Sequence, residues 1–231
     1  MHEIHIPEDI LAKPRARRGR VEVFDALDPA RTALVVIDMQ SYFLKPGGFL
    51  EVPCSRDIVG NINRIAAALR RTGGTVYWTQ HSFVPEWTSW YGVLASGEFA
   101  ERMIADSAPD APGYAIHPDM DVQPQDVLLH KTRYSAMLPE SCDLETHLRR
   151  TGADTVIVTG TLTNVCCEST ARDAMMKNYK VVFVSDANAT RTDEEHNATL
   201  KAMVQVFADV RNTNEVVGLL QAGAAGAQAA E

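Results

Sequence analysis

The chain has 231 residues, of which 45% are hydrophobic and 23% are charged. This composition is typical of a globular protein with a sizeable core, and it excludes a disordered, collagen-like or coiled-coil chain. The 22 Lys and Arg residues against 30 Asp and Glu residues give a net charge of −8, which argues against nucleic acid as the main partner. The longest aliphatic run, residues 33–37, is far shorter than the roughly 20 residues of a membrane helix.

Residues 1–30 are predicted to form an N-terminal arm. The arm has no apolar stretch of the kind that a secretion signal needs. Its first 20 residues carry a local charge of +2, from Lys13, Arg15, Arg17, Arg18 and Arg20 against Glu3, Glu8 and Asp9. We expect a solvated arm that packs on its own or a neighbouring subunit, and the alternative is a basic arm that binds an anionic partner.

Strands and helices are predicted to alternate along the rest of the chain. Short apolar runs indicate strands at 32–38, 75–80, 126–131, 155–159, 181–185 and near 208–211. Amphipathic spacing indicates helices at 57–72, 98–105, 144–150, 163–178, 192–207 and 214–220. The aromatic and proline-rich segment 84–124 is typical of a binding loop or lid, and the low-complexity segment 221–231 is expected to be a flexible tail.

This alternation predicts a single α/β domain over residues 31–220. Continuous apolar strands with helical connections form a mostly parallel sheet of about six strands, covered on both faces in a three-layer α/β/α arrangement. Ligands of such sheets bind beyond the carboxyl ends of the strands. The side chains to inspect are therefore Asp38, Gln80, Lys131, Asp186 and those that follow Thr159.

Cysteine usage favours a reducing, cytoplasmic compartment. The four cysteines Cys54, Cys142, Cys166 and Cys167 form no CxxC pair. If Thr163 caps the following helix, Cys166 lies in the first turn, where free N–H groups and the helix dipole stabilise a thiolate. The alternative for Cys166 is a small buried core residue, which fits Cys167 better.

Two charged residues end buried strands. Asp38 follows the run Val-Val-Ile, and Lys131 ends Val-Leu-Leu-His-Lys. Taken alone, Asp38 could be a loop cap and Lys131 a surface lysine. Together with Cys166 at the same edge of the sheet, they could activate a thiol nucleophile. A carboxylate can remove the thiol proton, and an ammonium stabilises both the carboxylate and the thiolate.

Several segments resemble the isochorismatase-like cysteine hydrolases. They are ALVVIDMQ (33–40), KTRYSAM (131–137), VTGTLTNVCCEST (158–170) and VVFVSDANAT (181–190). The resemblance runs from about Thr32 to Leu220 and implies a Rossmann-like fold and a triad of Asp38, Lys131 and Cys166. It also implies a cis peptide bond between Thr161 and Leu162, and an oxyanion hole formed by the N–H groups of Leu162 and Cys166.

The resemblance implies a cysteine-dependent amidohydrolase. Such an enzyme cleaves a small amide or a ureido or carbamoyl C–N bond through a thioester and releases ammonia or a carbamate. Local similarity is greatest to the ureidoacrylate amidohydrolases. The branch that uses a metal has an Asp-x-His pair where this chain has Thr79-Gln80-His81, so no metal or other cofactor is expected. The family also implies a homodimer or homotetramer.

Other functions stay open at this point. An isochorismatase-type vinyl-ether hydrolase is disfavoured by Cys166, and a haloacid-dehalogenase-like phosphatase needs a second Asp where Gln40 stands. A dinucleotide-binding module would need a GxGxxG motif, and a non-catalytic binding protein is the remaining alternative. Substrate-binding candidates are Gln40, Phe43, Gln80, Trp87, Trp90, Arg133 and Tyr134, with Leu162 and His81 beside them.

Overall fold

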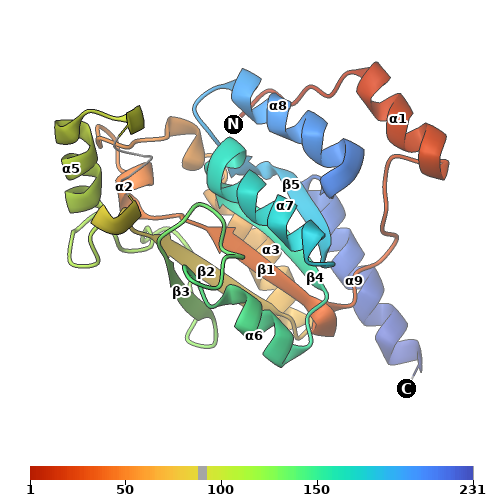
Figure 1. Ribbon diagram of the computed structural model, residues 1–231. Coiled ribbons are helices and arrows are strands. Elements are labelled where there is room, and N and C mark those ends of the chain that lie inside the picture. The colour runs from red at the N-terminus through yellow and green to blue at the C-terminus, as the bar shows by residue number, and fades with distance from the viewer. Residues whose placement is uncertain (88–92, 231) are drawn as a thin grey trace.

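A six-stranded parallel sheet forms the centre of the molecule, as the computed structural model shows (Figure 1). The structure describes residues 1–87 and 93–230. The strand order is β3-β2-β1-β4-β5-β6, and every pair is parallel. The strands are β1 (Thr32–Ile37), β2 (Thr75–His81), β3 (Val127–Lys131), β4 (Thr155–Thr161), β5 (Lys180–Ala189) and β6 (Asp209–Arg211).

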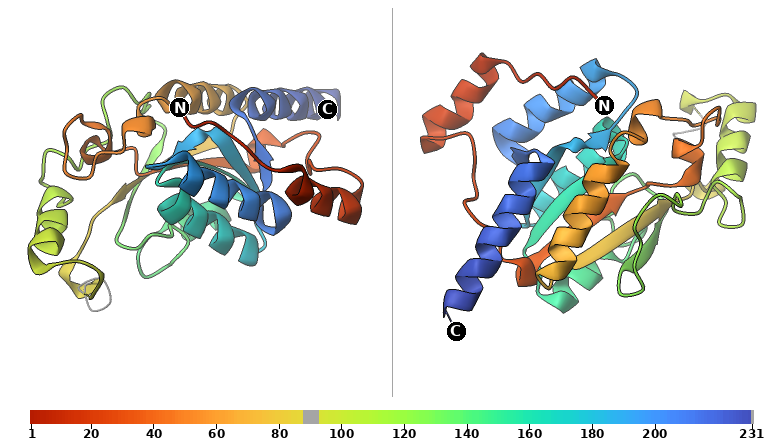
Figure 2. Two further views of the ribbon diagram at one scale, coloured as in Figure 1. Left: turned by 90° about the horizontal axis from the view of Figure 1, so that it is seen from above. Right: turned by 180° about the vertical axis from the view of Figure 1, so that it is seen from behind.

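Helices cover both faces of the sheet, which confirms the predicted α/β/α layers. In Figure 2 the layer of α3 (Val59–Arg71) and α9 (Thr213–Ala230) lies on one side of the strands. The opposite face carries α6 (Leu144–Thr151), α7 (Glu168–Met176) and α8 (Asp193–Ala202). Each face has its own apolar cluster, because successive residues of a strand point to opposite sides.

The shorter elements lie mostly in the connections. They are α1 (Glu8–Arg18), η1 (Pro29–Arg31), α2 (Ser41–Leu44), η2 (Pro53–Ser55), η3 (Pro85–Trp87), α5 (Gly97–Asp106), η4 (Thr163–Cys167) and η5 (Met203–Phe207). Helix α5 agrees with the short helix predicted inside the long loop region. The capping box predicted at the start of α8, between Thr192 and Glu195, is also confirmed.

The topology places a crevice at the middle of the sheet. The chain leaves β1 toward β2 and β3, then returns across the other face to β4, which pairs with the opposite edge of β1. The strand order therefore reverses between β1 and β4. In an open parallel sheet, ligands bind outside the carboxyl ends of the strands at such a reversal.

Two chain ends differ from the sequence-based boundaries. The last helix was expected to stop near Leu220, but α9 continues through the Ala- and Gly-rich residues to Ala230. Alanine is the strongest helix former, which explains the continuation. The arm contains α1, whose weak amphipathic pattern did not indicate a helix, and residues 1–5 pack on the α8 region of the same chain.

Two further findings concern compartment and covalent state. None of the four cysteines forms a disulfide. Among the described residues, no helix is both long enough and apolar enough to cross a membrane. The cytoplasmic location and the homo-oligomer stay predictions.

Candidate active site

Asp38, Lys131 and Cys166 lie together at the carboxyl edge of the sheet. Asp38 directly follows β1, Lys131 ends β3, and Cys166 lies in the η4 turn after β4. The Nζ of Lys131 is 2.7 Å from Oδ2 of Asp38, and both side chains are completely buried. The Cys166 thiol lies close enough to both groups that each of them shifts its pKa. The fold thus brings the three residues of the predicted triad within reach of one another.

Asp38 is held by the neighbouring strand β2. Its φ angle of +49° lies in the left-handed region, which Asp tolerates better than most residues. The hydroxyl of Thr79 donates to Oδ1 at 2.7 Å and accepts the N–H of Asp38 at 3.2 Å. The sequence-based reasoning missed Thr79 as a site residue, although a polar residue between buried apolar neighbours near a strand end was a usable signal.

Lys131 reaches across β2 to the carboxylate. Its ammonium also donates to the carbonyl of Arg133 at 3.1 Å. Burial acts to lower the pKa of Lys131, but the negative charge of Asp38 and the thiol of Cys166 outweigh it, so the pKa is raised. The ammonium therefore stays charged at neutral pH. A buried charge of this kind is retained only when it is paired.

The Cys166 side chain is a neutral thiol at neutral pH. Burial raises its pKa to about 12; Asp38 adds to this shift, and Lys131 opposes it. This raised pKa runs against the expectation of a thiolate stabilised by the helix start, and burial is its largest cause. The proposed cap is wrong: Leu162 occupies the capping position of η4, and the Thr163 hydroxyl bonds to His196 instead.

Cys167 is a contrasting neighbour. Its side chain is fully buried, and its Sγ lies 4.0 Å from the carbonyl oxygen of Thr159. It packs in the apolar cluster beneath α7, together with Ala171 and Ala174. Burial raises its pKa well above the usual value. Cys166 belongs to the same cluster, so its core alternative is met in part, but it also lies beside the charged pair of Asp38 and Lys131.

The backbone after β4 passes close to β1. Gly160 has a φ angle of +117°, and an added Cβ would lie 2.1 Å from the carbonyl oxygen of Ile37, so no larger residue fits. The peptide bond between Thr161 and Leu162 is cis, at the position that the resemblance implied. Within the described residues, the N–H of Leu162 donates to no other group.

The side chain of Gln40 forms hydrogen bonds within the protein. Its amide group donates to the carbonyls of His81 and Tyr114 and accepts from the N–H of His81 and the hydroxyl of Tyr42. These contacts tie the chain after β1 to the end of β2 and to the long loop. The side chain thereby shapes the wall of the site through the backbone of its neighbours.

The other substrate-binding candidates differ in position. Phe43 is buried in the apolar cluster beside Tyr42, and Gln80 donates to the carbonyl of Tyr114. Arg133 and Tyr134 are half-buried next to Lys131, and the Tyr134 ring lies 6.2 Å from that of His81. Trp90 and the side chain of Trp87 lie outside the described residues. These assignments stay predictions.

Burial lowers the pKa of His81 well below its usual value, and Lys131 lowers it further, so this ring is neutral. Across residues 1–87 and 93–230, no group of three His, Cys, Asp or Glu side chains is arranged to hold a metal ion. The absence of a cofactor stays a prediction.

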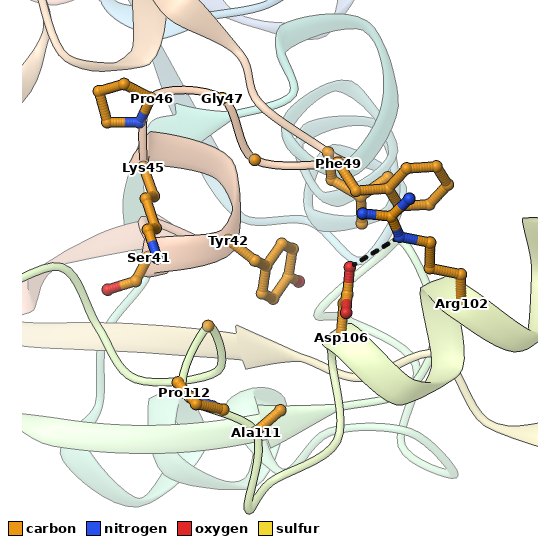
Figure 3. Close-up of a pocket in the computed structure, with 13 residues that line it drawn as sticks. Ser41, Tyr42, Lys45, Pro46, Gly47, Phe49, Arg102, Asp106, Ala111 and Pro112 are labelled. Atoms are coloured by element: carbon orange, nitrogen blue, oxygen red, sulfur yellow. Dashed lines mark ion pairs between the residues drawn. The ribbon is translucent and has the colours of Figure 1, made fainter.

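A separate hollow lies beside this centre. Its volume is about 310 Å³, and residues of α2, of the chain that follows it and of helix α5 line it. Figure 3 shows Tyr42 and Lys45 on one side and Arg102 on the other. The guanidinium of Arg102 stacks 4.2 Å from the Phe49 ring and lies 3.6 Å from Asp106. None of the three triad residues lines this cavity.

Comparison with known proteins finds a matching family model and similar sequences. The Isochorismatase domain model matches residues 32–215. Ureidoacrylate amidohydrolase RutB of Methylobacterium radiotolerans is 30% identical over 225 residues, which cover 89% of this chain and 86% of that protein.

Solved structures show the same fold. A cysteine hydrolase from Pseudomonas syringae pv. phaseolicola superposes with a TM-score of 0.78 at 31% identity, covering 87% of this chain and 98% of that one. N-carbamoylsarcosine amidase from Thermoplasma acidophilum gives a TM-score of 0.64 at 27% identity, with coverages of 80% and 97%. The chain described here therefore belongs to the isochorismatase family of hydrolases.

Proposed function

We propose that this protein is a cysteine-dependent amidohydrolase that cleaves a small amide or a ureido or carbamoyl C–N bond. One observation carries the proposal: a buried thiol, Cys166, lies against a buried carboxylate–ammonium pair formed by Asp38 and Lys131. Two of the similar proteins, the ureidoacrylate amidohydrolase and the N-carbamoylsarcosine amidase, are named for hydrolysis of such bonds.

The first step of the proposed reaction forms a thioester. As the Cys166 sulfur bonds to the substrate carbonyl carbon, the thiol proton passes to the carboxylate of Asp38. A pKa of about 12 means that Cys166 does not ionise by itself at neutral pH, so this transfer to a neighbouring base is required. Lys131 keeps its positive charge beside the sulfur and stabilises the anion that develops there.

The N–H groups of Leu162 and Cys166 are the proposed donors to the oxyanion of the tetrahedral intermediate. The unused N–H of Leu162 supports this role, since a free donor at the site is available to a developing negative charge. Removal of one such donor typically lowers kcat by about 10²–10³-fold.

The second step breaks the C–N bond and regenerates the enzyme. The intermediate collapses, and the protonated Asp38 gives its proton to the departing nitrogen, which leaves as ammonia or as an amine. When an amine leaves from a ureido or carbamoyl group, the group left on the sulfur is a carbamoyl thioester, and its hydrolysis releases the carbamate. A water molecule then attacks the thioester carbonyl while Asp38 takes its proton. The Cys166 sulfur leaves and is reprotonated by Asp38, which restores the thiol and the carboxylate.

The two adjacent cysteines provide a matched test. Ammonia release is measured on ureido acids, carbamoyl amino acids, nicotinamide, biuret-like compounds and simple amides, with and without EDTA. Wild type and Cys167→Ala are expected to hydrolyse at least one class, and Cys166→Ala is expected to lose about 10³-fold or more of kcat. EDTA is expected to leave the activity unchanged.

Two outcomes would contradict the proposal. Full activity of Cys166→Ala would remove the nucleophile assignment. Loss of activity on chelation, restored by a divalent metal, would favour a metal mechanism. Light scattering on the wild type tests the separate prediction of a homodimer or homotetramer.

A further inference from the structure

A stacked pair of histidines lies behind the turn that carries Cys166. The ring of His2 stacks on that of His196, with centroids 4.4 Å apart and planes inclined by 16°. The two residues are 194 positions apart in the sequence, and both are buried. In Figure 2 the first residues of the chain run beside α8, close to the carboxyl ends of the central strands.

The hydrogen bonds of His196 define its protonation and link it to η4. The carbonyl of Ser185 accepts a bond from Nε2 at 2.9 Å, so Nε2 carries the proton. Burial lowers the pKa of His196 to about 4, and the ring is therefore neutral. Its Nδ1 must then accept, and the Thr163 hydroxyl donates to it at 2.9 Å.

His2 is fixed just as closely. The N–H of Thr190 donates to Nε2 of His2 at 3.0 Å, so the Nδ1–H of His2 faces the carboxylate of Asp193 at 2.7 Å. The hydroxyl of Thr190 in turn donates to the side-chain carbonyl of Asn164 at 2.7 Å. The ring of His2 thus holds Thr190 from one side while η4 is bonded to it from the other.

Two routes therefore connect His2 with the η4 turn. One runs through His196 to Thr163, the first residue of η4, and the other through Thr190 to Asn164, the second. Cys166 follows in the same turn. Reaction geometry is sensitive to small displacements, since a shift of about 1 Å can lower a rate by about 10²-fold.

We propose that His2 is a positioning residue, which acts through His196 and Thr190 to hold the η4 turn and thereby set Cys166 against Asp38 and Lys131. The proposal rests on the function proposed above for Cys166. In this role His2 supports catalysis without touching the substrate.

The primary test compares kcat and KM of His2→Ala, His2→Phe and His5→Ala on an amide that the wild type hydrolyses. His2→Ala should lower kcat by about tenfold or more while KM changes by less than about twofold. His2→Phe keeps a ring to stack but loses both hydrogen bonds, and an intermediate kcat is expected. His5, whose side chain is exposed in the same segment, is the matched control and should behave as wild type.

A second pair of variants tests the other end of the route. Thr163→Ser keeps the hydroxyl that donates to His196 and should keep kcat within about twofold of wild type. Thr163→Val preserves the shape but leaves Nδ1 of His196 without its donor, and kcat should fall as it does in His2→Ala. Ile65→Val, in the apolar cluster on the opposite face, shows how much kcat changes when the fold is weakened elsewhere.

An activity-independent readout separates this proposal from the proposed function. The rate at which iodoacetamide alkylates Cys166, followed by mass spectrometry of the peptide 151–172, should change in His2→Ala and not in His5→Ala. Unchanged kcat and alkylation in His2→Ala would overturn the positioning role. So would a rise in KM alone, or an equal fall of kcat in Ile65→Val. Absence of amide hydrolysis by the wild type would instead contradict the proposed function, and the alkylation result would still test the positioning.

Discussion

Strand β3 has an ion pair at each end, and the carboxylates of both pairs are almost completely buried. Before the strand, Asp126 is paired with Arg70 of α3, and after it, Lys131 is paired with Asp38. The carboxylate of Asp126 accepts two bonds from Arg70, at 3.0 and 2.6 Å, one from the Trp78 ring N–H at 2.8 Å and one from the N–H of Gln123 at 2.9 Å. All of these partners are fixed parts of the fold.

At the carboxyl end of the strand, the carboxylate of Asp38 accepts fewer hydrogen bonds than that of Asp126. Asp38 is bonded to Thr79 and Lys131, and its remaining neighbour is the Cys166 thiol, a group whose proton it can take. A carboxylate that is saturated by fixed donors stabilises a structure. A carboxylate that keeps a movable proton beside it can do acid–base chemistry. Burial and charge pairing alone therefore do not identify the active site.

The largest expected effect comes from removing the charge of each carboxylate in turn. Asp38→Asn should lower kcat by about 10³-fold while the fold persists, because the amide cannot take the thiol proton. Asp126→Asn should leave kcat within about twofold of wild type. Kinetics and circular dichroism of both variants check this. Equal losses of kcat, or a collapsed Asp38→Asn, would contradict the distinction.

The second-largest expected difference is between variants that lack one of the two cations, Lys131 or Arg70. Lys131→Met leaves a buried carboxylate without its counter-ion, and we expect the free energy of unfolding to fall by about 3–5 kcal/mol, with loss of activity. Arg70→Met should be milder, at about 2 kcal/mol, because Trp78 and Gln123 still bind Asp126. Urea unfolding and kinetics of both variants provide the comparison. An active Lys131→Met would contradict the assigned role.

The pKa of the Cys166 thiol should fall together with kcat when the charge of Asp38 is removed. Asp38 raises this pKa and Lys131 lowers it, so Asp38→Asn should lower the pKa of the thiol below about 12 even though kcat falls. The pH dependence of Cys166 alkylation, followed on the peptide 151–172, measures the shift. A pKa that rises, or that does not change, in Asp38→Asn would show that the two groups do not interact.

The smallest effect concerns the histidine behind η4. His196 has a folded-state pKa of about 4, with burial the largest cause. An unfolded histidine titrates near 6.5, so the unfolded chain binds more protons between these values, and stability should fall as pH drops from 6.5 to 4. In a variant such as His196→Gln, the loss of unfolding free energy between pH 6.5 and pH 4 should be smaller by an amount on the order of 1 kcal/mol or more. Unfolding curves across that range test it, and an unchanged slope would refute it.

Much of the fold could be predicted from the sequence because the strands are buried on both faces. All six residues of β1 are buried, and such runs remain readable without alternation. Asp38 and Lys131 could be singled out because each follows apolar residues at a strand end. The resemblance then added the cis bond and the position of Cys166.

The rest depends on tertiary contacts that local pattern does not record. Nothing near His2 in the sequence indicates that it stacks on His196. The residues around Gln40 likewise do not indicate the four hydrogen bonds that its side chain makes within the protein. The protonation of Cys166 was misjudged for the same reason. Its depth of burial is set by elements far away in the chain, whereas the helix start is visible locally.

The most direct test of the central claim is to trap the acyl group. A reaction with the substrate class that releases ammonia is quenched in acid, and the peptide 151–172 of Cys167→Ala, in which Cys166 is the only cysteine, is analysed by mass spectrometry. The account predicts an added mass equal to the acyl fragment on Cys166, absent when Cys166 is also changed to Ala. Steady hydrolysis with no adduct, and with the same rate in the variant that lacks Cys166, would contradict it.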